Sequence, residues 1–368
     1  MGVSTVKFQW REPGSVDGFR SGVCLHGHTM HSRECLSFLP RHLHPVPGIS
    51  QLVSYFQCAR GVDFARAWWT PPLTPACALS LERKQIADLG LQPMVSLTDH
   101  DDIEAGFALG ITASQDTPVS VEWTVPFERS IFHLGIHNIP RNRARRWMAA
   151  MTDYRLAPCE AMLPGILDEF AGISDVLIVL NHPFWLEEGV AESDHHRALE
   201  RILRECVRWF DAFELNGTRC WKENADTIEL ARAHQRPVIS GGDRHACEPS
   251  ACINLTNARS VAEFVSEIHD GHSSILFMPQ YRKPMAQRIM EASHDILRTY
   301  PDYPGRERWA DRIFYSGKDG AARTVAQIWQ GREPWWLTGA AAAVQFFGGT
   351  RFSPALGWLL AERGESHP

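Results

Sequence analysis

Short apolar runs alternate with amphipathic stretches along most of the chain. The run at 175–180 is apolar at almost every position, which is typical of a strand that is buried on both faces. Helices are predicted at 196–209 and 222–235, and another short strand is predicted at 237–241. This alternation of strands and helices predicts a parallel α/β architecture.

The same rhythm continues up to about residue 280, and about seven or eight strands fit a closed or nearly closed barrel better than an open sheet. We therefore divide the chain into a barrel at 1–280 and a helical extension at 281–368 that packs on the barrel. Further strands are predicted at 6–10, 22–28, 93–97, 118–121, 131–136, 211–215 and 274–278, and further helices at 80–89, 101–110, 141–151, 163–170 and 261–270.

The segment 36–79 interrupts the rhythm as an insertion that is rich in proline and holds the pair Trp68-Trp69. Long irregular loops often cover functional sites. We expect this segment to cover the mouth of a site, and a long ordered surface loop is a nearly equal alternative. Its own His-x-His pair, His42 and His44, is flanked by proline and is assigned to the loop.

Side chains that bind metals follow several predicted strands directly. His26 and His28 lie one residue apart at the end of the first apolar run, so both point to the same face of a strand. Barrel enzymes carry their chemistry at the C-terminal ends of the strands. These histidines and carboxylates are more numerous than the ligands of one metal ion, so the sequence predicts a cluster of two or three metals. The other members are His100, Glu122, His133, His182, Asp243 and His245.

These motifs and their order resemble the PHP family, the polymerase and histidinol phosphatase superfamily. The resemblance covers about residues 22 to 250. It implies a distorted (β/α)7 barrel, a trinuclear metal site and hydrolysis of phosphoesters. The similar stretches are His26-Gly27-His28-Thr29, Thr98-Asp99-His100-Asp101, Pro118-Val119-Ser120-Val121-Glu122, Phe132-His133-Leu134-Gly135, His182-Pro183 and Gly242-Asp243-Arg244-His245.

The resemblance also implies a role for each matching residue. The first metal would be held by His26, His28, Glu122 and Asp243, the second by Glu122, His133 and His182, and the third by His100 and His245, with Glu122 as the bridge between the first two. His and carboxylate sites of this kind admit Zn, Mn or Fe.

The third site raises a question of alignment. The family commonly supplies an acid shortly after the first motif, and Arg33 stands at the aligned position here, with Glu34 one residue later. A one-residue step on a strand turns a side chain to the other face. We expect the chain to bulge or turn after Ser32, so that Glu34 reaches the cluster and Arg33 faces away or meets the substrate.

The expected reaction is attack on phosphorus by a metal-bridging hydroxide in a phosphate mono- or diester. Arg33, Arg219 and Arg244 are the candidates for binding phosphate oxygens, because arginine suits bidentate phosphate contacts. Arg244, between two ligands, is the first choice, and Asp243 or His245 would pass a proton to the leaving oxygen. A metal-dependent hydrolase of C–N or lactone bonds and a non-catalytic metal-binding module are the alternatives.

Composition narrows the expected partners. The net charge of −6 gives no reason to expect general nucleic-acid binding, which leaves a small-molecule phosphoester as the expected partner. Nine scattered cysteines without a C-x-x-C motif predict reduced thiols in the cytoplasm. We expect no signal peptide and no membrane span, since the late apolar stretch at 335–349 is too short. The sequence does not indicate an oligomeric state.

Overall fold

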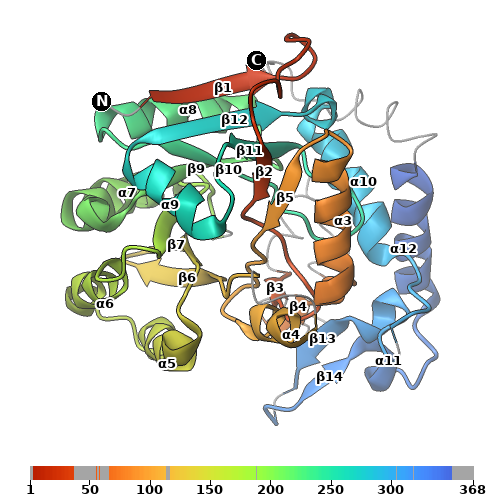
Figure 1. Ribbon diagram of the computed structural model, residues 1–368. Helices are drawn as coiled ribbons and strands as arrows, with labels where there is room; N and C mark the ends of the chain where they lie inside the picture. Colours follow the sequence, from red (N-terminus) through yellow and green to blue (C-terminus); the bar gives the residue numbers. More distant parts are fainter. Residues whose placement is uncertain are drawn as a thin grey trace.

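Three β-sheets and the helices that pack on them make up the fold in the computed structural model (Figure 1). The structure describes residues 3–36, 55, 58, 66–112, 117–187, 189–303, 305–317 and 319–349. The prediction of a mixed α/β protein is confirmed. The way in which the strands pair differs from the prediction in several places.

The first sheet combines strands from both ends of the region that was predicted as a barrel. β1 pairs with β12 in parallel and β2 pairs with β5 in parallel, whereas β11 runs antiparallel to both of its neighbours. β11 was not predicted. The order across the sheet is β1 (Val3–Phe8), β12 (His272–Phe277), β11 (Cys252–Thr256), β2 (Ser21–Cys24) and β5 (Gln92–Val95).

The second sheet contains two adjacent strands that are buried along their whole length. β8 and β9 are buried at every position, which confirms the expectation from the apolar run at 175–180. β10, β9 and β8 are parallel, but β7 is antiparallel to both β8 and β6. The order is β10 (Val238–Gly241), β9 (Ala212–Asn216), β8 (Leu177–Asn181), β7 (Ser130–His137) and β6 (Val121–Phe127).

The prediction of a uniformly parallel arrangement is therefore wrong. β6 extends to Phe127 and β7 begins at Ser130, so only Glu128 and Arg129 connect them. A connection this short joins antiparallel strands, because a parallel pair needs a long crossover. The sequence pattern ended the first of these strands too early, at residue 121, and so concealed the hairpin.

The two large sheets meet at two isolated parallel bridges, Gly27 with Arg244 and His100 with Glu122. We call these contacts the two seams. At the first seam His28 N donates to Arg244 O at 2.8 Å, and Asp243 N donates to His26 O at 2.9 Å. A barrel closed by continuous strand pairing is not present in the described ranges, where single-residue bridges join separate sheets.

Each helix predicted between residues 80 and 270 is present, with shifted ends. α3 begins before the predicted start at residue 80, because the Thr74 side chain caps it and Pro75 occupies its first turn. Packed aromatic rings fill the space beneath the helices, such as Trp147 of α5 and Phe170 of α6, whose centroids lie 4.5 Å apart. The helices are α3 (Pro75–Ala87), α4 (Glu104–Thr112), α5 (Arg141–Leu156), α6 (Leu163–Ala171), α7 (Glu192–Cys206), α8 (Trp221–Ala233) and α9 (Val261–His269), with 3-10 turns η2 (Glu160–Met162) and η3 (Val207–Trp209).

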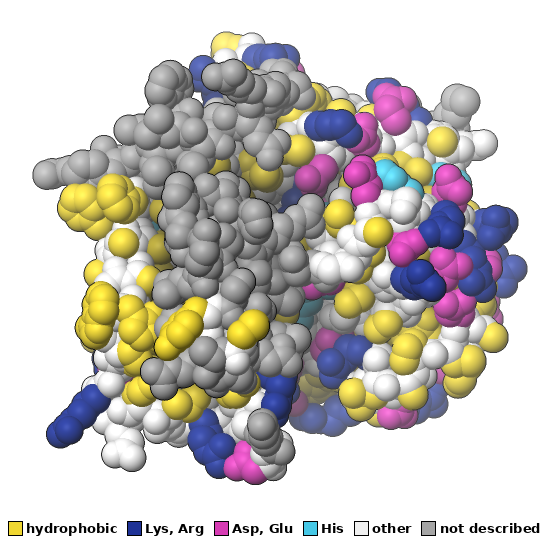
Figure 2. All heavy atoms as spheres, turned by 180° about the vertical axis from the view of Figure 1, so that it is seen from behind, with side chains coloured by type: hydrophobic (Ala, Val, Ile, Leu, Met, Phe, Trp, Pro, Cys, Tyr) yellow, Lys and Arg dark blue, Asp and Glu magenta, His cyan; other side chains and the backbone are white. Residues whose placement is uncertain are grey.

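The C-terminal region is helical only in part. α12 packs against α10 (Figure 1), and hydrophobic side chains gather on the flank that α12 occupies in the view from behind (Figure 2), including the exposed Trp335 and Phe346. The described elements are η4 (Pro279–Arg282), α10 (Met285–Leu297), η5 (Trp309–Asp311), β13 (Ile313–Ser316), β14 (Ala322–Thr324), α11 (Val325–Ile328) and α12 (Trp335–Gly348).

A third sheet connects this C-terminal region to the insertion, and it was not predicted. β13 pairs with β14 and with β4 (Ala67–Trp69), and β4 pairs with β3 (Glu34–Cys35). Most of the predicted lid, with His42 and His44, lies outside the described residues, whereas Trp68 and Trp69 are in β4. None of the helices in the described ranges has both the length and the apolar character that a membrane crossing requires.

An ion pair between Arg244 and Glu82 lies inside the protein, next to the first seam. Arg244 Nε is 2.8 Å from Glu82 Oε1, and the two side chains are 4% and 1% exposed. Ser250 Oγ donates to the same carboxylate at 3.1 Å, and Gln85 Oε1 accepts from Arg244. The pair ties α3 to the segment that follows β10.

Glu82→Gln should destabilise the metal-free protein by about 3–5 kcal/mol, because it leaves the Arg244 charge buried without a counter-charge. Urea unfolding measures this loss. Asp88→Asn is the matched control, since Asp88 forms only an exposed pair with Lys84 on the same helix, and such a pair is worth about 0.5 kcal/mol or less. A Glu82→Gln loss as small as that of the control would contradict a structural role for the pair.

Candidate metal centre

Histidines and carboxylates from both seams converge on one buried cluster. His26 Nε2 lies 3.1 Å from His28 Nε2 and 2.9 Å from Glu122 Oε2. His28 Nε2 lies 3.3 Å from Asp243 Oδ1. Because β2 ends at Cys24 and the chain pairs across the first seam, both histidines are held beside the segment that carries Asp243.

Glu122 occupies the middle of this cluster and is 1% exposed. Its Oε1 lies 3.1 Å from His182 Nε2 and 3.6 Å from His133 Nδ1, while its Oε2 lies 3.3 Å from His100 Nε2. Asn181 donates its side-chain amide to Oε1 at 3.0 Å. One carboxylate thus faces a histidine within β7 and histidines from the segments that follow β5 and β8, which is the arrangement expected of a bridging ligand.

Glu34 lies at the opposite side of the cluster from His182. Its Oε2 is 3.5 Å from His100 Nε2 and 3.4 Å from His245 Nε2. Ser32 Oγ donates to Oε1 at 2.6 Å and fixes the carboxylate. The chain turns at residues 30–31, before β3 begins, so the alternation of faces along a strand does not carry over to Glu34. Arg33 is exposed, with its guanidinium 5.8 Å from the Trp68 ring.

Two of the candidate ligands have unusual backbone angles. His182 has a φ of 26° and Asp243 a φ of 52°. Positive φ is uncommon for residues other than glycine, and such residues concentrate at functional sites. In both cases the turn comes directly after a buried strand, and it directs the side chain into the cluster.

Burial and neighbouring charges shift the pKa values of the cluster residues in opposite directions. Burial lowers the pKa of His28 to about 4. At His245 burial is outweighed by the Glu34 carboxylate, which raises the pKa to about 9. Burial alone would raise the pKa of Glu122, but the surrounding imidazoles, His26 foremost, hold it well below its ordinary value. The carboxylates therefore stay charged and need positive partners.

The donor set fits divalent metal ions. Ligand atoms on one tetrahedral ion at 2.0–2.1 Å lie about 3.3 Å from one another, close to the separations given above. His133 Nδ1 is buried and has no hydrogen-bond partner in the described ranges. Nitrogen and carboxylate donors suit Zn, Mn or Fe. Four groups have ligand atoms within 4.8 Å of one another: His26, Glu122 and His182; His26, His28 and Asp243; His28, Glu34 and His100; and His100, Glu122 and His133.

A second layer of polar residues lies behind the ligands and was missed in the sequence. Glu214 Oε2 is 2.8 Å from His26 Nδ1, and Asn216 Nδ2 donates to Asp243 Oδ2 at 3.2 Å. Thr218 Oγ1 donates to the same oxygen at 2.9 Å. The signal was present, since Glu214 lies in the strand predicted at 211–215 and Asn216 follows that strand directly.

Of the three arginines expected at the substrate, the structure places only Arg219 beside the cluster. Its Nη2 lies 3.7 Å from Asp243 Oδ2, and its guanidinium lies 3.8 Å from the centre of the Trp185 ring. Arg244 was also expected at the substrate. It lies between Asp243 and His245 in the chain, but its side chain forms the buried ion pair with Glu82.

Trp69 lies at the rim of the cluster, and Trp68 does not. The Trp69 ring centroid is 5.6 Å from that of His245. Trp68 instead stacks on Phe314 of β13, with the ring planes 8° apart. Of the predicted aromatic pair, one residue is thus available to limit the site and the other holds the third sheet together.

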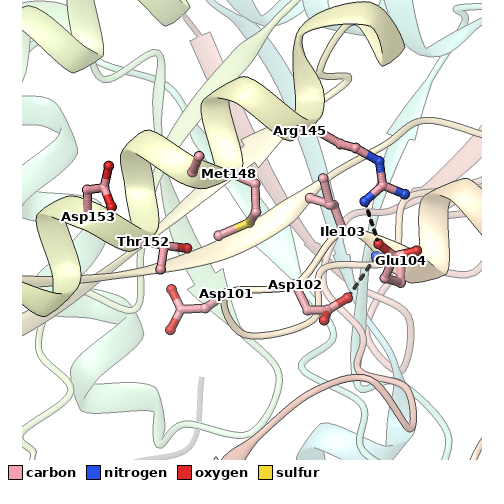
Figure 3. Close-up of a pocket in the computed structure, with 9 residues that line it drawn as sticks. Asp101, Asp102, Ile103, Glu104, Arg145, Met148, Thr152 and Asp153 are labelled. Carbon is pink, nitrogen blue, oxygen red and sulfur yellow. Dashed lines mark hydrogen bonds and ion pairs between the residues drawn. The ribbon is translucent and has the colours of Figure 1, made fainter.

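A separate hollow of about 330 Å³ opens near α5. Figure 3 shows Arg145 paired with Glu104 across it, and Asp102 accepting from the Glu104 backbone. Asp101 and Asp153 line the same hollow, and none of the nine candidate metal ligands does. The hollow is therefore not the mouth of the metal centre.

No protein family model matches the chain, and no curated protein sequence matches it. Similar solved structures include PsfC from Pseudomonas syringae, with 14% identity, 58% of this chain and 86% of that chain covered and a TM-score of 0.39. A candidate metal-dependent phosphoesterase from Bifidobacterium adolescentis has 14% identity and a TM-score of 0.32, and the match covers 55% of this chain and 92% of that chain. An amidohydrolase from Chromobacterium violaceum, with bound sulfate and no metal, has 14% identity and a TM-score of 0.34, and the match covers 67% of this chain and 97% of that chain. Likenesses at this level carry no argument about function.

The C-terminal region supports Glu34 from outside the cluster. Glu34 pairs with Trp69 in the third sheet, and Trp69 pairs with Ile313. Arg306 Nη1 donates to Met30 O at 2.9 Å, on the turn that precedes Glu34. Residues from beyond position 300 therefore hold the chain on both sides of this carboxylate.

Arg306→Ala should weaken the binding of metal at the site of Glu34 by about 10- to 100-fold, the usual cost of losing a residue that supports a ligand. Metal content after dialysis, and titration with Mn²⁺, measure this change. Arg308→Ala is the control, because Arg308 pairs only with Asp311 and Glu333 on the surface among the described residues. Equal metal binding by the two variants would mean that Arg306 does not support the site.

Proposed function

We propose that the protein is a metal-dependent phosphoesterase of the PHP type, which hydrolyses a small phosphate mono- or diester. The observation that carries the proposal is the convergence of nine histidine and carboxylate side chains on one cluster, with Glu122 at its centre. We further propose that seven of the ten strands of the two large sheets form a distorted barrel, whose two halves are joined only at the two seams. Residues 1–280 would form this unit and 281–368 the extension.

The cluster would hold two or three ions. Glu122 is assigned as the ligand shared between neighbouring ions, since histidines lie within 3.6 Å of both of its oxygens. Glu34, His100 and His245 are assigned to the third ion. When bound, such ions act as Lewis acids and lower the pKa of water, so that hydroxide is available near neutral pH.

Arg219 is the residue that favours a phosphoester over a neutral substrate. Its Nε is buried and lacks a hydrogen-bond partner in the ranges that the structure describes, although its Nη2 already faces Asp243. Trp185 holds the guanidinium in place by stacking. An anionic oxygen would satisfy this donor, whereas an amide or a lactone brings no charge to it. A non-catalytic module would have no use for such a donor beside its metals.

When only two ions are bound and the third site is empty, transfer of a proton to the leaving oxygen is assigned to His245, which is then free of metal. Its side chain is 20% exposed, against 6% for Asp243, so it can reach a substrate at the rim of the cluster. Trp69 beside it excludes water from one side. Asp243, whose Oδ2 accepts from Asn216 and Thr218, is held as a ligand.

The purified protein should contain more than one equivalent of Zn, Mn or Fe and should hydrolyse at least one compound in a panel of phosphate mono- and diesters. Glu122→Gln should remove this activity and keep the fold, because the amide loses the charge and one ligand oxygen. Elemental analysis and phosphate release measure the two outcomes. Absence of bound transition metal, with no activity after metal is added, would refute the proposal.

Arg219→Ala should lower kcat/KM for the best phosphoester by about 100-fold, which is the cost of removing one donor to the reacting charge. The matched control is Arg208→Ala, since Arg208 also stacks on a tryptophan, Trp209 at 3.9 Å, but belongs to η3 on the surface. Unchanged kcat/KM in Arg219→Ala would mean that Arg219 does not bind the phosphate in the transition state.

A further inference from the structure

Glu214 lies behind the cluster and touches His26, which belongs to two of the four candidate metal groups. We propose that Glu214 is a positioning residue that, together with Asn216, sets the orientation of His26 and Asp243 and thereby determines the metal affinity of the centre. This inference rests on the proposed function, because it requires metal to bind at the cluster. Glu214 itself would not be a metal ligand.

The two ring nitrogens of His26 face different partners. Nδ1 lies 2.8 Å from Glu214 Oε2, while Nε2 faces His28, Glu122 and Asp243 at 3.1, 2.9 and 3.7 Å. A neutral imidazole carries one N–H. When the proton sits on Nδ1 and is donated to Glu214, the lone pair on Nε2 points at the cluster. A carboxylate in this position also makes the imidazole a stronger ligand.

Asn216 extends the same arrangement to a second ligand. Its side-chain amide donates to Glu214 Oε1 at 2.6 Å and to Asp243 Oδ2 at 3.2 Å. Its Oδ1 accepts from Thr218 N, so the amide has only one orientation that satisfies all of its partners. Asn224 in turn holds both backbone groups of Asn216. Hydrogen bonds thus connect Asn224 of α8 through Asn216 of β9 to Asp243 in the cluster, and they fix the orientation of these side chains.

The neighbouring strand leaves space for this carboxylate. A Cβ atom at Gly241 of β10 would lie 2.4–2.7 Å from the carboxyl atoms of Glu214, which is closer than real contacts allow. Glycine at this position therefore lets Glu214 reach His26. Glu214 is 2% exposed, so its charge is removed from water.

The position of Glu214 is costly unless it serves the cluster. A buried carboxylate needs hydrogen bonds and a positive partner. Glu214 receives hydrogen bonds from Asn216 and His26, and in the described ranges it has no ion pair with lysine or arginine within 4 Å. Cations bound at the far side of the His26 ring would supply the missing charge through the imidazole.

The test is metal binding by Glu214→Gln, compared with the wild type. The Gln side chain keeps the size and one acceptor oxygen but removes the charge. Titration of the metal-free protein with Zn²⁺ in competition with a chelator should show affinity weakened by about 10- to 100-fold. The absorption spectrum of the Co²⁺-loaded protein should change, because the orientation of the His26 ring changes.

Two further variants complete the design. Glu267→Gln is the control, since this carboxylate belongs to α9 and contacts Thr256, away from the cluster. Gly241→Ala keeps every ionisable group but displaces the Glu214 carboxyl, and it should weaken Zn²⁺ binding as Glu214→Gln does. If Glu214→Gln fails to fold, the comparison is made with Gly241→Ala alone.

Equal Zn²⁺ affinity in the wild type and in these variants, with only a lower unfolding midpoint of the metal-free protein, would overturn the proposal and leave Glu214 a structural role. The measurement does not depend on turnover. A wild type that binds metal but hydrolyses no phosphoester would refute the proposed function while the comparison of affinities still decides the role of Glu214. A wild type that binds no metal would overturn both.

Discussion

The two large sheets touch through single backbone bridges, and the residues at these bridges carry the candidate metal ligands. Gly27, between His26 and His28, bridges to Arg244, between Asp243 and His245, and His100 bridges directly to Glu122. At these bridges imidazoles and carboxylates from both sheets meet, and His133 joins them from within β7, which pairs continuously with β6 and β8. The architecture and the cluster are in this sense the same feature.

Such a concentration of polar groups is unfavourable without compensation. Isolated charges in the interior cost far more than hydrogen bonds recover. Glu34, Glu122, Asp243 and Glu214 are all buried within contact of histidines. Imidazoles can neutralise them only by holding protons, and at His28 burial opposes this. Divalent cations would resolve the conflict, because they supply charge and leave the imidazoles neutral.

The site was more predictable than the topology. Ligands such as His26 and His182 follow apolar runs directly, and buried strands are recognised from such runs without knowledge of their partners. Pairing depends on where strands end: the extension of β6 to Phe127 decided the direction of β7, and no local pattern revealed it. Glu34 lies beside His100 and His245 as expected, but the chain turns at residues 30–31, before Ser32, whereas the turn was expected after it.

Two features of the site depend on contacts that the sequence does not show. Arg244 was expected at the substrate because of its neighbours, although its side chain lies in the buried ion pair with Glu82 of α3. Glu214 was overlooked because a single carboxylate in an apolar strand has no motif around it. Its importance depends on Gly241 and Asn216, which become neighbours only in the folded chain.

The third sheet also bears on the order of events during synthesis. All nine candidate ligands have been translated once the ribosome passes residue 245, but β13, which supports Glu34 through β4, begins only at Ile313. β1 likewise cannot pair until its partner β12, at residues 272–277, has been synthesised. A nascent chain therefore carries a full complement of imidazoles and carboxylates for some seventy residues before it can hold them in place. Assembly of the complete centre is a late step, which begins only when the C-terminal region has left the exit tunnel.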